Sequence, residues 1–218
     1  MSKKINIVIV GAGNIAREHL RALAKIKNIN VLCICSRTLT KAINLSQKFK
    51  VNNYSSNAKL FIKENKNIID GIMILVSLNQ IYKVSKELSV FSIPLFIEKP
   101  PTLSLSELNN LNLILDKHKV PNMVGMNRRF YSIFEKGKKI IDKNGGLYSI
   151  VIEGHERLNL INKIYPKKIL NKWLYANSCH TIDLIRYFGG EIKKFYYTKN
   201  SKIINSGDHF SCSFKYNT

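Results

Sequence analysis

Two glycines and an alanine near the start of the sequence have the spacing of a phosphate-binding turn. Residues 11–16, Gly-Ala-Gly-Asn-Ile-Ala, match the pattern G-x-G-x-x-G/A and directly follow a short apolar run, residues 5–10. The first glycine permits a tight turn, the second lets the backbone approach a pyrophosphate, and the small sixth residue permits close packing of a helix on a strand. We expect backbone N–H groups at the start of that helix to bind a dinucleotide. The residues involved are Gly11, Gly13, Asn14 and Ile15. The alternative is a glycine-rich turn without a ligand.

The end of the second expected strand bears on the choice of cofactor. An Asp or Glu at this point accepts a hydrogen bond from the ribose 2′-hydroxyl of NAD. This chain has Ser36, Arg37 and Thr38 there instead, and an arginine can pair with the 2′-phosphate of NADP. The sequence therefore favours NADP over NAD, with Ser36 and Arg37 as cofactor-binding residues. The alternative is that Arg37 stacks on the adenine or faces solvent.

A lysine follows another expected strand, in the segment Glu98-Lys99-Pro100-Pro101. Ligands of open α/β sheets bind beyond the carboxyl ends of the strands, so Lys99 is expected to face the crevice that holds a nicotinamide. Pro100 restricts the preceding backbone and can form a cis peptide bond. Glu98 and Lys99 are therefore candidate cofactor-binding residues, although a lysine at a strand end is in general a surface charge.

The elements that must position these residues alternate along the first 126 residues. The sequence predicts strands at 5–10, 31–35, 68–76, 94–97 and 122–126. It predicts helices at 14–27, from 38 or 40 to 49, at 58–65, 80–91 and 103–118. Strands that are apolar on both faces and alternate with helices indicate a doubly wound α/β fold, a parallel sheet covered by helices on both sides.

The pattern changes after residue 129. The sequence predicts a basic helix at 132–142, strands at 147–153, 192–198 and 210–216, and a helix at 177–188 that two glycines end. This part is expected to be α+β, with an open and mainly antiparallel sheet. We therefore predict two domains, residues 1–126 for cofactor binding and residues 127–218 for a partial substrate or oligomerisation domain.

The charge of the chain, +21, is spread evenly. Residues 1–126 contain 18 Lys and Arg against 7 acidic residues, and residues 127–218 contain 17 against 7. Nucleic-acid binding rests on this charge alone, and the excess consists of 28 lysines with only 7 arginines, whereas base recognition favours arginine. We expect no nucleic-acid partner, although a basic surface attracts anionic substrates. No apolar run is long enough to span a membrane, and the four cysteines form no disulfide framework, so the expected location is the cytoplasm.

Other polar clusters are interpreted more simply. Glu18 and His19 fit the solvated face of the first helix. Glu153, His155 and Glu156 resemble a metal-ligand set but more often lie at a surface, so no metal site is predicted.

The glycine turn, the triplet 98–100, residues 124–130 (Val-Gly-Met-Asn-Arg-Arg-Phe) and residues 180–184 (His-Thr-Ile-Asp-Leu) together resemble the Gfo/Idh/MocA family of glucose–fructose oxidoreductase and inositol dehydrogenase-like enzymes. Their order and spacing agree along most of the chain. The resemblance implies an N-terminal Rossmann domain and a C-terminal α+β domain, here shorter than is usual for the family. It also implies oxidation or reduction of a sugar, polyol or sugar nucleotide at a secondary carbinol, with NAD(P) as cofactor.

The same resemblance assigns the candidate catalytic residues. Lys99 corresponds to the lysine that contacts substrate and cofactor, and His180 to the histidine that follows an aspartate by four residues. That aspartate is Ala176 in this chain, and Asn177 is a possible hydrogen-bonding substitute. Asp183, about one helical turn after His180, is either a partner of the imidazole or a packing residue, and Tyr187 is either a spare proton donor or a packed side chain.

Two hypotheses follow. The first is an oxidoreductase in which His180 acts as general acid or base and Lys99 stabilises the alkoxide. The second is a cofactor-binding sensor, assembly subunit or fragment without catalysis, which the missing aspartate and the short C-terminal part favour. Either form could assemble into a homo-oligomer through the C-terminal sheet.

Overall fold

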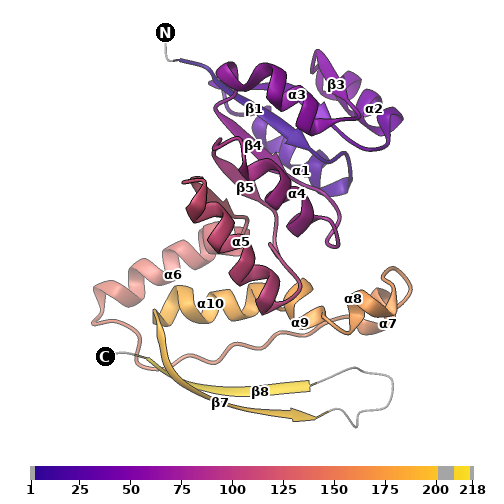
Figure 1. Ribbon diagram of the computed structural model, residues 1–218. Helices are drawn as coiled ribbons and strands as arrows, with labels where there is room; N and C mark the ends of the chain where they lie inside the picture. Colours follow the sequence, from indigo (N-terminus) through magenta and orange to yellow (C-terminus); the bar gives the residue numbers. More distant parts are fainter. Residues whose placement is uncertain (1–2, 201–208, 217–218) are drawn as a thin grey trace. The chain divides into compact units, whose positions relative to one another are not determined.

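The computed structural model describes residues 3–200 and 209–216 and divides into two compact units, Met1–Gly125 and Met126–Thr218 (Figure 1). The first unit is built on a sheet of six parallel strands in the order β3-β2-β1-β4-β5-β6. The strands are β1 (Ile5–Val10), β2 (Ile29–Cys35), β3 (Asn53–Ser55), β4 (Gly71–Ile74), β5 (Leu95–Ile97) and β6 (Asn122–Val124). This order confirms the predicted doubly wound sheet and places its switch point between β1 and β4.

Helices connect the strands of the first unit. They are α1 (Asn14–Leu23), α2 (Leu39–Phe49), α3 (Ala58–Asn65), the 3₁₀ helix η1 (Lys66–Ile68), α4 (Ile81–Ser89) and α5 (Leu105–Lys117). The buried side chains form two clusters. One includes residues of α4 and α5, and the other residues of α1 and α2.

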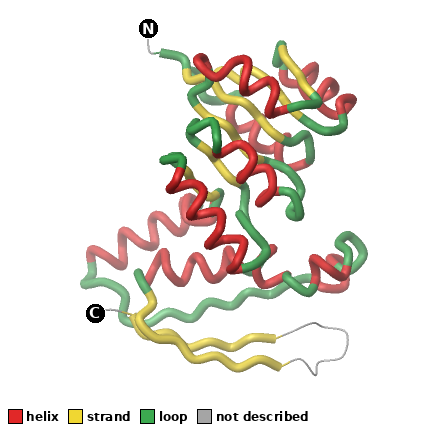
Figure 2. The backbone as a smooth tube through the Cα atoms, viewed as in Figure 1, coloured by secondary structure: helices red, strands yellow, loops and turns green. Residues whose placement is uncertain are grey.

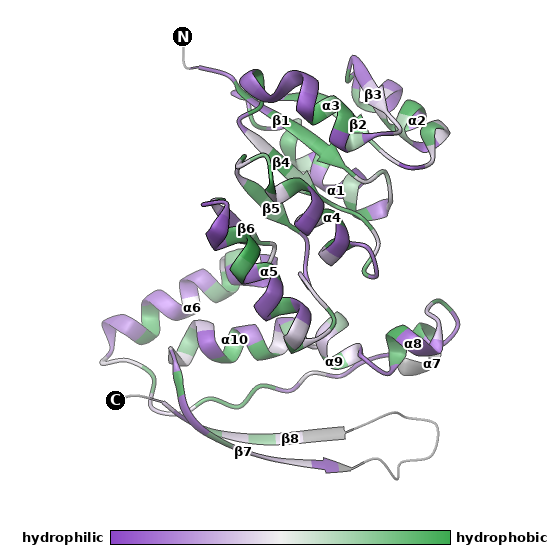
Figure 3. Ribbon diagram, in the orientation of Figure 1, coloured by the Kyte–Doolittle hydropathy of each residue, from purple (hydrophilic) through white to green (hydrophobic). Residues whose placement is uncertain are grey.

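Strand β1 separates these two clusters. Val8 and Val10 belong to one cluster, while Ile7 and Ile9 belong to the other. Successive side chains of a strand point to opposite faces, so a strand covered on both sides must be apolar throughout. Figure 3 shows the hydrophobic colouring along the later part of β1. Each fully buried isoleucine or valine contributes about 2 kcal/mol to stability.

The start of α5 shows how local sequence fixes an element. The Ser104 hydroxyl accepts a hydrogen bond from the Glu107 backbone N–H at 3.2 Å, and the Glu107 carboxylate accepts one from the Leu103 N–H at 3.2 Å. The first bond satisfies an N–H group that the first helical turn leaves open, and the second holds the residue just before the cap. Ser104 is thus the N-cap of α5.

Two cysteines lie side by side on β2. Cys33 and Cys35 are both buried, and their Sγ atoms are 3.6 Å apart. The hydrogen bond with Cys33 and then burial raise the pKa of the Cys35 thiol. The Cys35 thiol therefore stays protonated, and burial in the sheet shields both side chains from reagents.

The second unit begins with short helices and ends in two strands. Its elements are η2 (Asn127–Phe130), α6 (Ser132–Lys143), α7 (Leu158–Ile161), α8 (Lys167–Leu170), α9 (Trp173–Ala176), α10 (Cys179–Gly189), β7 (Ile192–Asn200) and β8 (His209–Tyr216). Strands β7 and β8 pair antiparallel, as expected for the second sheet. After α10, Gly190 turns the chain with φ at +81°.

One expected strand of the second unit is absent. Residues 147–153 alternate in polarity and were expected to pair in the sheet, but the structure shows them as a loop between α6 and α7 (Figure 2). Tyr148 and Val151 are fully exposed or nearly so. Alternating polar and apolar side chains make a segment suitable for a strand, but a strand forms only where it can pair with the edge of another strand. The described sheet of this unit has only two strands, β7 and β8.

Candidate functional site

The glycine turn lies between β1 and α1, at the switch point of the sheet. Gly11 has a φ of +125°, and a Cβ atom there would lie 2.2 Å from the carbonyl oxygen of Leu75. Its N–H donates to the Cys35 carbonyl at 2.8 Å. The turn is therefore pressed between the ends of β2 and β4, and only glycine fits at its first position.

Gly13 has a different environment from Gly11. It occupies the N-cap of α1 without a side-chain cap, and a Cβ atom there would meet nothing within 4 Å. Asn14 and Ile15 are exposed, whereas Ala16 is buried. An uncapped helix start with open space beside a glycine fits a pyrophosphate, because the first N–H groups of a helix attract anions. The residues present therefore fit the expected dinucleotide.

At the end of β2, Ser36 is held by its neighbours. Its N–H donates to the Ser55 carbonyl at 2.9 Å, and its hydroxyl oxygen accepts from the Thr38 N–H at 3.3 Å. Arg37 is exposed. The side chain that was expected to contact a 2′-phosphate is thus accessible to a ligand.

Lys99 follows β5 at the carboxyl edge of the same sheet. The Glu98 N–H donates to the Ile74 carbonyl at 3.0 Å, which extends the pairing of β5 with β4 by one residue. The Lys99–Pro100 peptide bond is cis, and Lys99 is half-buried. Glu98 and Lys99 therefore lie beyond the same ends of the strands as the glycine turn.

The carboxylate of Glu98 is buried and contacts protein atoms through both oxygens. One accepts a hydrogen bond from the Lys99 N–H at 2.5 Å, and the other lies 3.3 Å from Nε2 of His19. The interpretation of His19 as part of a solvated helix face is wrong. Its side chain is 23% exposed, and its ring meets Phe96 edge-to-face at 5.3 Å between centroids.

A local signal could have identified His19. It lies three residues after Ala16 on α1 and so shares the helix face that packs on the sheet. Glu18 does keep the solvated position, in an exposed ion pair with Arg21 at 2.6 Å.

In the second unit, Asp183 is paired with an arginine. Arg129 donates from Nε at 2.6 Å and from Nη2 at 2.5 Å to the two carboxylate oxygens of Asp183, and its guanidinium lies 5.8 Å from the centre of the Tyr187 ring. The hydrogen bond to Asp183 raises the pKa of Arg129. Asp183 and Tyr187 therefore fasten α10 to η2, which supports the packing role for both residues.

His180 is buried in the first turn of α10. Its backbone N–H donates to the Asn177 carbonyl at 3.2 Å. The Asn177 side-chain amide donates to both carboxylate oxygens of Glu156, at 2.9 and 3.0 Å, and the Ser178 hydroxyl donates to the same group at 3.3 Å. Sequence reasoning missed the contact between Asn177 and Glu156, because Glu156 precedes Asn177 by 21 residues and no local pattern links the two.

Glu156 does not join its sequence neighbours. His155 and Glu153 lie 3.5 Å apart, and both are largely exposed. Among the residues that the structure describes, no three His, Cys, Asp or Glu side chains gather as metal ligands. In the same part of the chain, no helix is long and apolar enough to cross a membrane.

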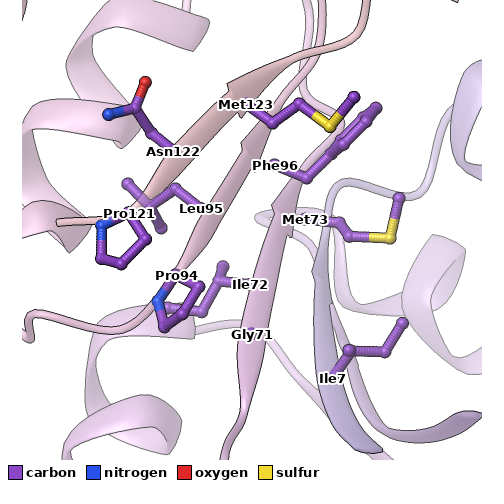
Figure 4. Close-up of a pocket in the computed structure, with 10 residues that line it drawn as sticks. All are labelled: Ile7, Gly71, Ile72, Met73, Pro94, Leu95, Phe96, Pro121, Asn122 and Met123. Carbon is purple, nitrogen blue, oxygen red and sulfur yellow. The ribbon is translucent and has the colours of Figure 1, made fainter.

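A groove of about 330 Å³ lies on the sheet of the first unit (Figure 4). Gly71, Pro94 and Pro121 mark the amino ends of β4, β5 and β6 along it, and Met73 and Phe96 extend along its face. Its lining is mainly apolar, and it reaches the sheet edge opposite the glycine turn. The groove therefore does not coincide with the candidate cofactor site.

The candidate residues thus form one group in each unit. The first unit brings the glycine turn, Ser36, Glu98 and Lys99 to one edge of its sheet. The second gathers Asn177, His180 and Asp183 on or next to α10. That Lys99 and His180 act on one substrate stays a prediction.

Comparison with known proteins identifies relatives. A family model described as an oxidoreductase family with an NAD-binding Rossmann fold, GFO/IDH/MocA, matches residues 5–126. An uncharacterized oxidoreductase of Bacillus subtilis, YrbE, is 25% identical over 212 residues, which are 94% of this chain and 60% of that protein. An oxidoreductase of Formosa agariphila is 25% identical over 204 residues, covering 88% of this chain and 63% of that one. The chain thus spans about 60% of the length of these relatives.

Solved structures share the fold. Myo-inositol 2-dehydrogenase from Lactobacillus plantarum superposes with a TM-score of 0.79 at 20% identity, covering 98% of this chain and 67% of that one. An oxidoreductase from Agrobacterium radiobacter, solved in complex with NAD⁺, L-tartaric acid and magnesium, gives a TM-score of 0.78 at 14% identity, over 98% of this chain and 64% of that one.

Proposed function

Since this chain belongs to the GFO/IDH/MocA oxidoreductase family, with its NAD-binding Rossmann fold, we propose that it interconverts a secondary carbinol and a ketone with NADP as cofactor. The proposed substrate is a sugar, polyol or sugar nucleotide. Structural relatives named for myo-inositol support the polyol class. The high positive charge of the chain favours an anionic substrate such as a sugar nucleotide.

The first unit would hold the cofactor. Gly11, Gly13, Asn14 and Ile15 would bind the pyrophosphate through backbone N–H groups, and Ser36 and Arg37 would bind the adenosine ribose and its 2′-phosphate. When bound, the cofactor supplies or accepts the hydride at its nicotinamide ring.

Lys99 is the observation that carries the proposal. It follows β5 at the sheet edge that also bears the glycine turn, and its peptide N–H is fixed by the buried Glu98 carboxylate. We assign its ammonium group to the carbinol oxygen, where a positive charge stabilises the alkoxide that develops as the proton leaves.

His180 would take that proton. In the oxidation direction the hydroxyl proton passes to an imidazole nitrogen of His180, the C–H bond breaks as hydride leaves, and the carbon becomes a carbonyl. In reduction the same nitrogen returns the proton. Asn177, held by Glu156, orders the turn that begins α10 and so supports the imidazole.

Replacement of Lys99 tests the proposal. With NADPH and a panel of keto-sugars, inosose-type ketones and keto-sugar nucleotides, K99M is expected to lower kcat by about hundredfold or more, because an electrostatic stabiliser of the reacting oxygen is lost. Binding of NADPH should persist. K63M, at an exposed lysine of α3, is the matched control. A fully active K99M variant would exclude the role of Lys99.

Ala176 favours a second candidate, a cofactor-binding protein without catalysis. This residue stands where the family resemblance implies an aspartate, and its side chain is buried. Tight NADPH binding by the unmodified chain together with no turnover across the panel would support this alternative.

A further inference from the structure

We propose that His19 is a positioning residue for Lys99. In this arrangement His19 holds one oxygen of the Glu98 carboxylate, and the other oxygen holds the peptide N–H of Lys99. The consequence for catalysis rests on the function proposed above. The geometric claim concerns the first unit alone.

The contacts form a continuous chain. Nε2 of His19 lies 3.3 Å from Oε1 of Glu98, and Oε2 of Glu98 accepts the Lys99 N–H at 2.5 Å. The Glu98 side chain is only 11% exposed, so its carboxylate depends on protein partners in place of water. A hydrogen bond to a charged group is short and strong, and it limits the rotation of the peptide that precedes Lys99 Cα.

Packing leaves the carboxylate little freedom to rotate. The ring of Phe96 meets the His19 ring at 5.3 Å with planes inclined at 70°. A Cβ atom on Gly125 would lie 2.9 Å from the Phe96 ring and 3.5 Å from Oε2 of Glu98. The backbone at the end of β6 therefore packs against one side of the Glu98 carboxylate, and His19 of α1 packs against another side.

The position of His19 gives this contact its significance. Helix α1 starts directly after the glycine turn, so one helix presents both the expected pyrophosphate site and the partner of Glu98. His19 thereby ties the group expected to hold the cofactor to the strand end that carries Lys99. Loss of the hydrogen bond between His19 and Glu98 is expected to disturb the position of Lys99 more than the affinity of the protein for the cofactor.

Three substitutions separate hydrogen bonding from packing. In H19Q the side-chain amide nitrogen extends about as far as Nε2 of histidine and keeps a donor to Glu98. H19N carries the same amide one methylene shorter and cannot reach. H19F keeps the ring contact with Phe96 and lacks the donor. Thermal unfolding of each variant verifies that the chain is folded.

The first readout is spectroscopic and needs no substrate. In the full chain, the Lys99 amide proton should resonate downfield and exchange slowly with solvent in the unmodified protein and in H19Q. Loss of the tie in H19N and H19F should move this resonance upfield and speed its exchange by about tenfold or more.

The second readout is kinetic. With a substrate found in the panel above, H19N and H19F should lower kcat by about tenfold to hundredfold, since a small misplacement of a catalytic group has effects of this size. The Kd for NADPH should stay within about twofold, and H19Q should recover most of the rate.

The outcomes are distinct. An unchanged Lys99 amide in both H19N and H19F, or an equal disturbance in H19Q, would overturn the proposal. If no variant and no substrate gives turnover, the proposed reaction fails, while the amide measurement still decides whether His19 positions Lys99.

Discussion

Arg37 shows how one side chain can set the choice of cofactor. It is exposed, directly after β2, at the position where a carboxylate would select the 2′-hydroxyl of NAD. We expect R37A to raise the Kd for NADPH by about ten- to hundredfold, because a charge-assisted pair with the 2′-phosphate is lost. The Kd for NADH should hardly change. Fluorescence titration of both cofactors measures this, with K41A on α2 as the control. An equal loss for both cofactors would contradict NADP selection by Arg37.

The pair of Arg129 and Asp183 should contribute to the stability of the second unit. The Asp183 side chain is 10% exposed and receives two hydrogen bonds. D183N is expected to lower the free energy of unfolding by about 1–3 kcal/mol, because it removes the charge of a buried carboxylate that accepts two charge-assisted hydrogen bonds. D142N breaks the exposed pair with Lys138 and should cost about 0.5 kcal/mol or less. Urea unfolding of both variants tests this contrast, and similar losses would refute it.

At this scale the sequence identified residue types better than their partners. Lys99 and the glycine turn were predicted at the carboxyl ends of strands, where the structure has them. The partners His19 and Glu156 were not predicted. Each lies far along the chain from the group that it contacts, 79 residues for His19 and Glu98, and 21 for Glu156 and Asn177. Helical spacing places His19 on the face of α1 that packs on the sheet, but no local spacing identifies Glu98 or Asn177 as the partner.

The turn from β1 to α1 contains two glycines, of which Gly11 is required for the fold and Gly13 is expected to be required for cofactor binding. G11A is expected to destabilise the first unit by about 3 kcal/mol or more, because its Cβ would collide with the Leu75 carbonyl at a positive φ. G13A should leave stability within about 1 kcal/mol, since its Cβ meets no protein atom. It should instead weaken NADPH binding by about tenfold or more by occupying the space of the pyrophosphate. Thermal unfolding and cofactor titration of both variants measure the difference, and the reverse pattern would show that the tasks are misassigned.

Elements with a strong local signal were predicted, and those that depend on distant pairing were not. The apolar run of β1 and the glycine turn that follows it are local features, and both were predicted. Strand β3 has only three residues, Asn53–Ser55, and it forms because these residues pair with β2. The sequence of such a short segment does not predict that pairing. Residues 147–153 show the converse case, because their alternation is suitable for a strand while no strand forms.

On the scale of the whole molecule, β7 presents aromatic side chains to solvent. Phe195 and Tyr197 are 59% and 63% exposed, and they share one face of the β7–β8 pair, with ring centroids 6.3 Å apart. Lys194 and Tyr196 occupy the other face. We predict that the Phe195 face forms a homo-oligomer, since exposed aromatic side chains on a sheet favour association.

The double variant F195K/Y197K should therefore lower the sedimentation coefficient toward that of a monomer. Y196K, on the opposite face, should sediment like the unmodified chain. A monomer before any substitution would exclude self-association through this face.

The two thiols buried on β2 have a consequence for how unfolding can be followed. Cys33 and Cys35 are buried in the sheet, Cys179 on α10 is half-buried, and Cys212 on β8 is exposed. An alkylating reagent added to the native chain should consume Cys212 at once and reach the β2 pair only when the sheet opens. The slow modification of Cys33 and Cys35 themselves then reports how often the first unit opens, without any introduced label.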